Sequence, residues 1–408
     1  MITEVLVERV RQRLISHGDA DAATPALVTR ALRDEGVVLG DSGVLELVST
    51  LRDELIGLGP LRGLLDDPAV TDILVNPPGE VWIDRGHGME RGAVRMGSES
   101  AVRRLAQRLA SAAGRRLDDA SPYVDARLPD GIRLHAAIPP IAPEGTLLSL
   151  RIPRRRAFDL SELVAAGTVG PSGAQWLAEV MRQRLSFLVT GGTGSGKTTI
   201  LSTLLGLAAP TERLLLVEDS AELRPDHPHV VRLETRPPNL EGAGAVTLRD
   251  LVRQALRMRP DRVVVGEVRG AEVVDLLSAL NTGHEGGCGT VHANSAADVP
   301  ARLEALGLAA GIPRPAVHAL VAAGLDAVVH VERSPVDGSG RGSTRRVQGV
   351  FVLRRDPSGQ VVSVPALFRR GSDLVPGEAA GDLQRLFARD DRAGRVAEGA
   401  IAEGGVAC

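Results

Sequence analysis

Lysine is almost absent from this chain of 408 residues. Lysine and arginine together number 48, yet Lys197 is the only lysine. Both residue types carry a positive charge and keep a surface soluble, but they differ where a compact, strongly hydrated charge must fit a tight site. The sequence therefore indicates that Lys197 occupies a site that the planar guanidinium of arginine does not suit.

Cysteines and aromatic residues are scarce as well. The two cysteines, Cys288 and Cys408, make a disulfide framework implausible and favour a reducing compartment. Aromatic residues make up 2% of the chain and the net charge is −3, so few platforms for stacking bases and no overall basic field are present. We therefore expect no direct sequence-specific binding of nucleic acid.

Segments that would target the chain to a membrane or anchor it there are also lacking. Residues 1–10 include early acidic residues and no apolar signal-peptide core. No uninterrupted apolar stretch approaches the roughly 20 residues that a membrane-spanning helix needs. We expect a cytoplasmic protein, and any association with the membrane would be peripheral, through a partner.

The single lysine lies in a glycine-rich run with a defined pattern. Gly191 and Gly196 are separated by four residues and are followed by Lys197 and Thr198, which is the pattern of phosphate-binding loops. Backbone N–H groups of such a loop cradle phosphate oxygens, the lysine reaches the β- and γ-phosphates, and the Thr198 hydroxyl can bind Mg²⁺. The predicted cofactors are ATP and Mg²⁺, and the predicted binding residues are Gly191, Gly192, Thr193, Gly194, Ser195, Gly196, Lys197, Thr198 and Thr199.

The segments on either side of this loop support the prediction. Residues 186–190 are typical of a buried strand that enters the loop, and residues 199–205 are typical of a helix that leaves it. The N-terminus of that helix would point at the phosphates. A glycine-rich turn with a solvated lysine is the alternative interpretation, which the flanking strand and helix disfavour.

The hydrophobic pattern predicts an α/β protein made of several parts. We expect a helical N-terminal extension (1–50), a smaller α+β N-terminal domain (51–152), a linker (153–171), an ATPase domain (172–345), a C-terminal β-hairpin (346–370) and a partly disordered tail with one helix near 383–388 (371–408). In the ATPase domain, apolar strands alternate with helices, at residues 186–190, 213–218, 229–233, 262–267, 289–292 and 327–331. This alternation predicts a parallel sheet covered on both faces, which binds ligands beyond the carboxyl ends of its strands.

Acidic residues follow two of the predicted strands. Glu267 ends one strand, where it can act as the base or water-positioning group that ATP hydrolysis needs. A salt bridge to Arg269 is the alternative role for Glu267. Glu218 and Asp219 end a second strand at the same edge, and with Glu222 they can hold Mg²⁺ and its waters. This second acidic group leads us to favour the catalytic role for Glu267.

Two histidines flank a cysteine at four-residue spacing. His284, Cys288 and His292 would suggest a metal site if they lay on a helix, but a glycine-rich loop and a strand carry them. We therefore do not expect zinc. His292 can instead sense the γ-phosphate at the strand edge, and a structural, hydrogen-bonded histidine is the competing interpretation.

Taken together, these motifs resemble the secretion ATPases of the type II/type IV secretion superfamily, and within it the branch that assembles tight-adherence (Flp-type) pili. The resemblance spans roughly residues 58–302 and rests on the runs 125–133, 148–151, 191–199, 214–223, 232–239, 256–270 and 281–294. Two features depart from the family pattern. The tetracysteine zinc motif of many type II members is missing, and Cys288 stands between glycines where small hydroxyl residues are usual.

The resemblance implies a RecA-like P-loop ATPase domain preceded by the smaller N-terminal domain. It implies a homohexamer that binds nucleotide between the two domains. It also implies that Glu267 is the catalytic carboxylate, that Glu218 belongs to the magnesium shell or positions water, and that His292 acts together with the γ-phosphate.

The resemblance further implies that Arg127 and Arg133 reach the nucleotide from the N-terminal domain. Guanidinium groups suit the charge on a transferring phosphoryl group. The alternative for both arginines is an ion pair within their own hairpin, with Asp125 or Asp130.

The leading interpretation of the sequence is therefore a hexameric ATPase that powers assembly of a pilus or secretion machine at the cytoplasmic face of the membrane. Its expected partner is an inner-membrane platform protein. Two alternatives are a RecA-like motor for DNA transfer or translocation, and a nucleotide-gated assembly switch without turnover. Glu267 argues against the switch.

Overall fold

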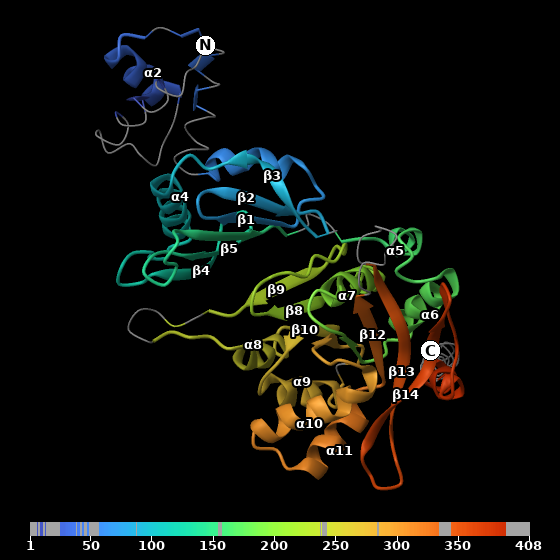
Figure 1. Cartoon of the computed structure of the whole chain (residues 1–408). Helices are drawn as coiled ribbons and strands as arrows, with labels where there is room; N and C mark the ends of the chain where they lie inside the picture. Colours follow the sequence, from blue (N-terminus) through green and yellow to red (C-terminus); the bar gives the residue numbers. More distant parts are fainter. Residues whose placement is uncertain are drawn as a thin grey trace, which may run out of the picture. The chain divides into compact units, whose positions relative to one another are not determined.

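The chain folds into two units, residues 1–154 (unit 1) and residues 155–408 (unit 2), each with a hydrophobic core of its own (Figure 1). The computed structural model describes residues 57–388 except 87, 154–156, 237, 239–242, 284 and 334–343. It also describes residues 6, 9, 10, 13, 25–37, 39, 40, 43, 44, 47 and 48. Most of the expected N-terminal extension and the end of the tail therefore lie outside the described residues.

Unit 1 is built on an antiparallel sheet. Its described elements are α2 (Pro25–Asp34), η1 (Gly59–Asp66), β1 (Asp72–Asn76), β2 (Glu80–Asp84), β3 (Met89–Arg95), α4 (Glu99–Ala112), β4 (Tyr123–Arg127), β5 (Arg133–Ala137) and β6 (Leu147–Arg151). The strand order is β3-β2-β1-β6-β5-β4. Buried residues alternate with more exposed ones along β1, which is the pattern of a strand that buries one face. Helix α4 covers that face, with Leu105 and Leu109 in the same core as Ile73 and Val75.

Unit 2 is built on a larger, mixed sheet. Its strands are β7 (Phe187–Thr190), β8 (Leu214–Glu218), β9 (Val230–Glu234), β10 (Arg262–Val268), β11 (Cys288–Val291), β12 (Ala327–Arg333), β13 (Arg345–Arg355), β14 (Val361–Arg370) and β15 (Asp373–Pro376). The order is β15-β14-β13-β12-β7-β11-β10-β8-β9. Neighbours from β12 to β9 pair in parallel, and neighbours from β12 to β15 pair antiparallel. The carboxyl ends of β7, β8, β10 and β11 therefore meet at one edge.

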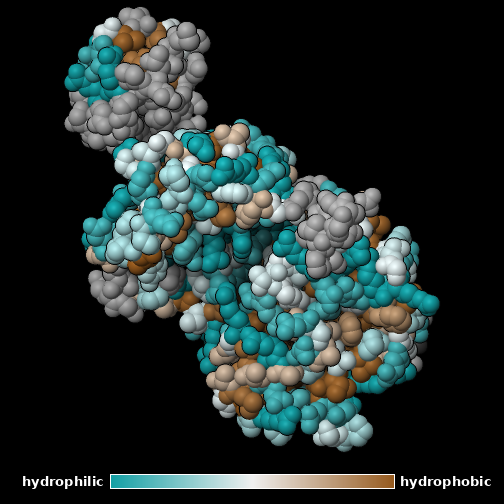
Figure 2. All heavy atoms as spheres, viewed as in Figure 1, coloured by the Kyte–Doolittle hydropathy of each residue, from teal (hydrophilic) through white to brown (hydrophobic). Residues whose placement is uncertain are grey.

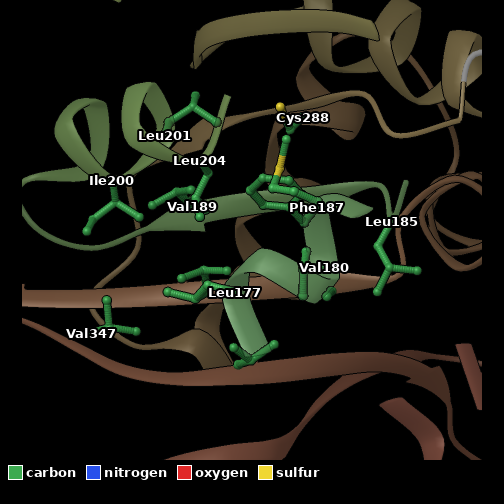
Figure 3. Packing of buried hydrophobic residues seen from close by; sticks show 14 of the residues in the cluster. Leu177, Val180, Leu185, Phe187, Val189, Ile200, Leu201, Leu204, Cys288 and Val347 are labelled. Atoms are coloured by element: carbon green, nitrogen blue, oxygen red, sulfur yellow. The ribbon is translucent and has the colours of Figure 1, made fainter. Parts of the chain in front are cut away.

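Helices cover both faces of this sheet. They are α5 (Leu160–Ala165), α6 (Pro171–Arg182), α7 (Lys197–Leu205), α8 (Leu248–Ala255), α9 (Glu272–Leu280), α10 (Val299–Ala309) and α11 (Arg314–Gly324), with the short η2 (Ala296–Asp298) and a helical segment at 380–388. One core contains α5, α6 and α7, and the other contains α8, α9, α10 and α11. Figure 3 shows the first core, where Leu177 of α6 and Leu204 of α7 gather around Phe187 and Val189 of β7.

The predicted α/β fold, with a parallel sheet covered on both faces, is confirmed. The expected strands correspond to β7, β8, β9, β10, β11 and β12, with ends that differ by at most two residues. The hairpin expected at 346–370 consists of β13 and β14. It pairs with β12, so the same sheet continues into this hairpin and on to β15.

The surface of unit 2 mixes hydrophobic and hydrophilic residues. On the face seen in Figure 2, hydrophobic residues occur in separate groups among hydrophilic ones. The large hydrophobic side chains exposed on the described part of unit 2 are Leu207, Leu308 and Phe368, which belong to three different parts of the fold. Among the described helices, none combines the length and the hydropathy that crossing a bilayer requires.

Candidate functional site

The glycine-rich run 191–199 links β7 to α7 at the carboxyl edge of the sheet. Gly191, Gly194 and Gly196 have φ angles of 151°, 70° and 98°, which glycine adopts far more readily than other residues. A side chain at Gly191 is excluded for a second reason, because its Cβ would collide with the carbonyl oxygen of Val331. The backbone path of the loop thus requires glycine, and α7 begins directly after it.

Lys197 is the first residue of α7, and its side chain turns back into the loop. It is only 8% exposed. Its Nζ donates to the carbonyl oxygens of Gly191 and Gly192 at 3.0 and 2.9 Å, and lies 3.4 Å from Nδ1 of His292. Burial lowers the pKa of Lys197, and the Glu267 carboxylate acts in the opposite direction. The three donors of the ammonium therefore face three acceptors, which holds a compact positive charge inside the loop.

His292 follows β11 and connects Lys197 to Glu267. An ammonium has no lone pair, so Nδ1 of His292 accepts from Lys197 and the proton of the neutral ring is on Nε2. Nε2 lies 3.1 Å from Oε1 of Glu267. Burial, followed by the charge of Lys197, lowers the pKa of His292, so the ring is neutral at pH 7. We call this arrangement the Lys–His–Glu chain.

A bulge in β10 places Glu267 in this chain. β10 and β11 pair in register up to Val265 and again at Val268, with an irregularity between them. Bulges of this kind bend a strand and redirect its side chains, often beside an active site. The Thr290 hydroxyl on β11 donates to the carbonyl of Gly266 at 2.6 Å, and so secures the bulged segment that carries Glu267.

Arg269 has a closer partner than Glu267. It forms an ion pair with Asp219, while its Nη2 lies 3.9 Å from Oε2 of Glu267. Asp219 is also contacted by the Thr235 hydroxyl, which lies 3.3 Å from its Oδ1. The salt bridge to Arg269, which was the alternative role for Glu267, is therefore only a long contact. His292 lies closer to Glu267 than Arg269 does.

Glu218 ends β8 and is 3% exposed. Its Oε1 accepts from the backbone N–H groups of Glu222 and Leu223, both at 2.9 Å. Its Oε2 is buried and has no hydrogen-bond partner within the described residues. Burial raises the pKa of Glu218 to about 7. Gly266 packs directly against it, because a Cβ on Gly266 would lie 2.7 Å from Cγ of Glu218.

This free oxygen bears on whether Mg²⁺ fits the site. In the part of the chain that the structure describes, no three His, Cys, Asp or Glu residues form a metal-binding group. Mg²⁺ in nucleotide sites needs no such cage, because one or two side chains hold it together with phosphate oxygens and waters. Oε2 of Glu218 can accept from a metal-bound water, and Thr198, the second residue of α7, follows Lys197 with its hydroxyl. The residues fit a hydrated Mg²⁺.

The two arginines expected to reach the nucleotide lie on the β4–β5 hairpin of unit 1. Arg133 forms a two-point ion pair with Asp125, at 2.7 and 3.1 Å. Arg127, opposite Arg133 in the hairpin, lies over the turn, with a guanidinium nitrogen 3.3 Å from the place of a Cβ on Gly131. The hairpin ion pair considered for Arg133 is therefore present. Contact of either arginine with a nucleotide stays a prediction.

Cys288 is a core residue of β11. It lies beside Phe187 in the core (Figure 3). Burial raises the pKa of its thiol to about 12, so the thiolate that metals prefer is not formed at neutral pH. His284 lies outside the described residues.

Sequence reasoning missed three contributors to this site. Gly266 allows Glu218 to approach the strand, and Thr290 secures the bulge. Arg345, at the start of β13, donates its Nε to the carbonyl oxygen of Gly194 at 3.0 Å. The glycine directly before the strand-end carboxylate was a usable signal. Thr290 and Arg345 gave none, because their roles depend on which strands become neighbours.

Proteins of known name resemble the chain over most of its length. It is 55% identical to a Mycobacterium tuberculosis protein whose name refers to conjugal transfer, over 78% of this chain and 90% of that protein. It is 34% identical to the conjugal transfer protein TrbB of Rhizobium radiobacter, over 70% of this chain and 84% of TrbB. It is also 34% identical to the type IV secretion system protein PtlH of Bordetella pertussis, over 72% of this chain and 93% of PtlH.

Solved structures with a similar fold include the ATPase DotB of Legionella pneumophila and the pilus retraction motor PilT. DotB has a TM-score of 0.51 and 19% identity, over 71% of this chain and 79% of DotB. PilT has a TM-score of 0.51 and 21% identity, over 70% of this chain and 81% of PilT. The profile of the family described as "Type II/IV secretion system protein" matches residues 54–336. The family profile covers more than half of the chain, and the chain has a phosphate loop with a carboxylate near it. The chain is therefore an ATP hydrolase that belongs to the Type II/IV secretion system protein family.

Proposed function

We propose that this protein is a hexameric ATPase that powers assembly of a pilus or secretion machine at the cytoplasmic face of the membrane. The observation that carries the proposal is the Lys–His–Glu chain, which joins the phosphate loop to a carboxylate at the same sheet edge. A nucleotide switch without turnover needs the loop but has no use for the carboxylate. Family membership supports the coupling of hydrolysis to a secretion machine.

Within the family, we assign the protein to the tight-adherence (Flp-type) branch on the motifs of its sequence. We expect its partner to be an inner-membrane platform protein, which would bring the ATPase to the membrane. Co-purification of the full chain with the membrane proteins of its own host tests this assignment. Recovery of a platform protein supports it, and recovery of a conjugation channel instead would contradict it.

In the proposed reaction, ATP and water give ADP and inorganic phosphate. The N–H groups of the loop bind phosphate oxygens, and Lys197 exchanges the carbonyls that it contacts for oxygens of the β- and γ-phosphates. Glu267 orients the attacking water and takes its proton, while the bond from the γ-phosphorus to its bridging oxygen breaks. His292, whose Nε2 lies 3.1 Å from Glu267, keeps the carboxylate close to the loop.

Further groups complete the proposed site. Mg²⁺, when bound, neutralises part of the phosphate charge, and Thr198 with the free oxygen of Glu218 would hold it and its waters. Arg127 and Arg133 would approach as unit 1 closes on the nucleotide. Side chains of Arg133 and Asp125 are 47% and 51% exposed, so breaking their ion pair costs about 1 kcal/mol or less.

The sharpest test of this chemistry is Glu267→Gln. The variant should bind ATP but release phosphate at least ~100-fold more slowly, because a general base contributes on this scale. Glu234→Gln is the matched control, since Glu234 ends β9 at the same sheet edge and the exchange removes the same charge. If Glu267→Gln and the control hydrolyse ATP equally well, the base lies elsewhere and Glu218 is the next candidate.

A motor for DNA transfer or translocation is the second candidate function. The relatives whose names refer to conjugal transfer favour it. Phosphate release by the full chain, measured with and without single-stranded DNA, separates the two functions. A pilus or secretion motor should be indifferent to the DNA, whereas strong stimulation by DNA would support the transfer motor.

A further inference from the structure

The outer side of the phosphate loop packs against the ends of two strands. Arg333 is the last residue of β12 and Arg345 is the first residue of β13, and the two are paired in register. Both guanidinium groups belong to unit 2, as the loop does. Two arginines at this position place positive charge against a loop whose inner side already holds Lys197.

The contacts of Arg345 are specific. Its Nε donates to the carbonyl oxygen of Gly194 at 3.0 Å. The aliphatic part of its side chain packs on Gly196, where a Cβ would lie 3.2 Å from Cδ of Arg345. Arg333 approaches the same peptide, because its Nη1 lies 3.5 Å from the place of a Cβ on Gly194. The side chain of Arg345 thus contacts both Gly194 and Gly196 of the phosphate loop.

The hydrogen bond to Gly194 determines which way a neighbouring N–H points. In a trans peptide, the carbonyl of Gly194 and the N–H of Ser195 point in opposite directions. With the carbonyl held on the outside by Arg345, the Ser195 N–H is directed inward. It donates to the carbonyl oxygen of Gly192 at 3.3 Å, and this oxygen also accepts from Lys197. This is the side on which phosphate oxygens bind.

Without a partner on the outside, this peptide would turn easily. Gly194 and Gly196 both have positive φ angles, and glycine populates either sign of φ about equally. A loop that must select one orientation on binding loses affinity, because only the fraction with the correct orientation is competent. A donor at the carbonyl also polarises the peptide and strengthens its N–H as a donor.

We propose that Arg345 is a positioning residue for the nucleotide, which fixes the Gly194–Ser195 peptide so that the Ser195 N–H faces the phosphates. Arg333 assists by placing a second positive charge beside the same peptide. The proposal rests on nucleotide binding by the phosphate loop. It concerns affinity rather than the chemical step, because Arg345 contacts the loop at Gly194 and Gly196, whereas other residues form the Lys–His–Glu chain.

Two substitutions of Arg345 separate its donor from its packing. Arg345→Met keeps the aliphatic chain and removes the donor. Arg345→Gln keeps a neutral N–H donor at the same position along the side chain. Arg346→Met is the matched control, because Arg346 is the next residue of β13 and successive strand residues point to opposite faces.

The measurement is the binding of a fluorescent ADP analogue to the full chain, followed by KM and kcat for ATP. Arg345→Met should weaken binding and raise KM by about tenfold, the scale of one charge-assisted hydrogen bond at a partly exposed site. Its kcat at saturating ATP should stay within about threefold of the wild type. Arg345→Gln should restore most of the affinity, and Arg346→Met should behave as the wild type.

The proposal is overturned if Arg345→Met binds ADP as the wild type does, or if Arg345→Gln is as weak as Arg345→Met. An equal loss in kcat, or a lower free energy of unfolding without nucleotide, would also overturn it, because either gives Arg345 another role. Lys197→Ala serves as the reference. If Lys197→Ala binds ADP normally, the loop itself is not the nucleotide site, and both the site assignment and this proposal fail.

Discussion

The side chain of Lys197 occupies a space bounded by the carbonyl oxygens of Gly191 and Gly192 and by the ring of His292. We expect Lys197→Ala to abolish ATP hydrolysis, because the loop then lacks its charge for the β- and γ-phosphates. Lys197→Arg should not restore it, since a planar fork is wider than an ammonium and the site is almost fully buried. Phosphate release at saturating ATP measures both. Near-normal release by the arginine variant would refute this account of the single lysine.

Glu218 makes the stability of the fold depend on pH. Burial raises its pKa from 4.5 to about 7, so the folded state binds this proton more tightly than the unfolded chain does. The stability that the protonated carboxyl contributes is complete below pH 4.5 and is lost as the pH rises through about 7. A shift of this size corresponds to about 3 kcal/mol.

Glu218→Gln should remove this dependence, because the amide keeps an acceptor for the two backbone N–H groups and cannot ionise. Urea unfolding of both proteins at about pH 5 and about pH 8 gives the test. The variant should gain about 3 kcal/mol relative to the wild type at the higher pH. A difference between the two proteins that does not change with pH would mean that Glu218 titrates as an exposed carboxyl does.

At the scale of elements, three parts of unit 2 meet at Arg262, the 1% exposed first residue of β10. Its guanidinium donates to Glu212, to the carbonyl of Met181 at the end of α6, and to the carbonyl of Gly286 before β11. Arg262→Met would remove one of the two arginines that pair with the buried carboxylate of Glu212, which keeps Arg184 at 3.2 Å, and a donor to the carbonyls of Met181 and Gly286. We expect it to lower the free energy of unfolding by about 2–4 kcal/mol, because the lost hydrogen bonds are charge-assisted and buried.

Arg249→Met is the control for this prediction. Arg249 also pairs with a carboxylate, Asp275, but its side chain is 43% exposed. Its loss should lower the free energy of unfolding by about 1 kcal/mol or less, because water screens the pair. Equal effects of the two substitutions in urea unfolding would show that the Arg262 pair does not hold the three elements together.

The elements of the sheet differ in how far the sequence predicts them. The apolar runs predict β7, β8, β10, β11 and β12, because strands buried on both faces leave a continuous hydrophobic signal. The pairing of β12 with the hairpin of β13 and β14 leaves no local signal in the sequence, because pairing partners are set by tertiary contacts. The bulge before Glu267 is hidden for the same reason, since it exists only relative to β11.

At the scale of the whole molecule, the division between residues 154 and 155 allows the role of unit 1 to be tested. A chain that starts at Phe158 keeps the cap of α5, where Asp159 and Glu162 bond reciprocally to each other's backbone N–H groups. It also keeps both cores of unit 2. We expect this chain to bind nucleotide but to hydrolyse little ATP, because the arginines of unit 1 are missing.

Alanine at Arg127 and Arg133 in the full chain should reproduce that loss without unfolding the protein. In a hexamer, mixing this variant with wild type should lower phosphate release by more than dilution does, because each subunit's closure is constrained by its neighbours. Phosphate release measured across mixing ratios gives the answer. A strictly linear curve, or full activity of the shortened chain, would make unit 1 an adaptor rather than part of the motor.

The lone lysine also makes the nucleotide site chemically addressable. Lys197 carries the only side-chain amine among the 408 residues, and that amine lies inside the phosphate loop. An amine-acylating reagent therefore has one side-chain target here, and bound ATP should shield it. Mass spectrometry of a single peptide would then report how many loops in an assembled machine are empty. Cross-linkers that require surface lysines will, conversely, miss the side chains of this protein, so its neighbours must be mapped through carboxylates.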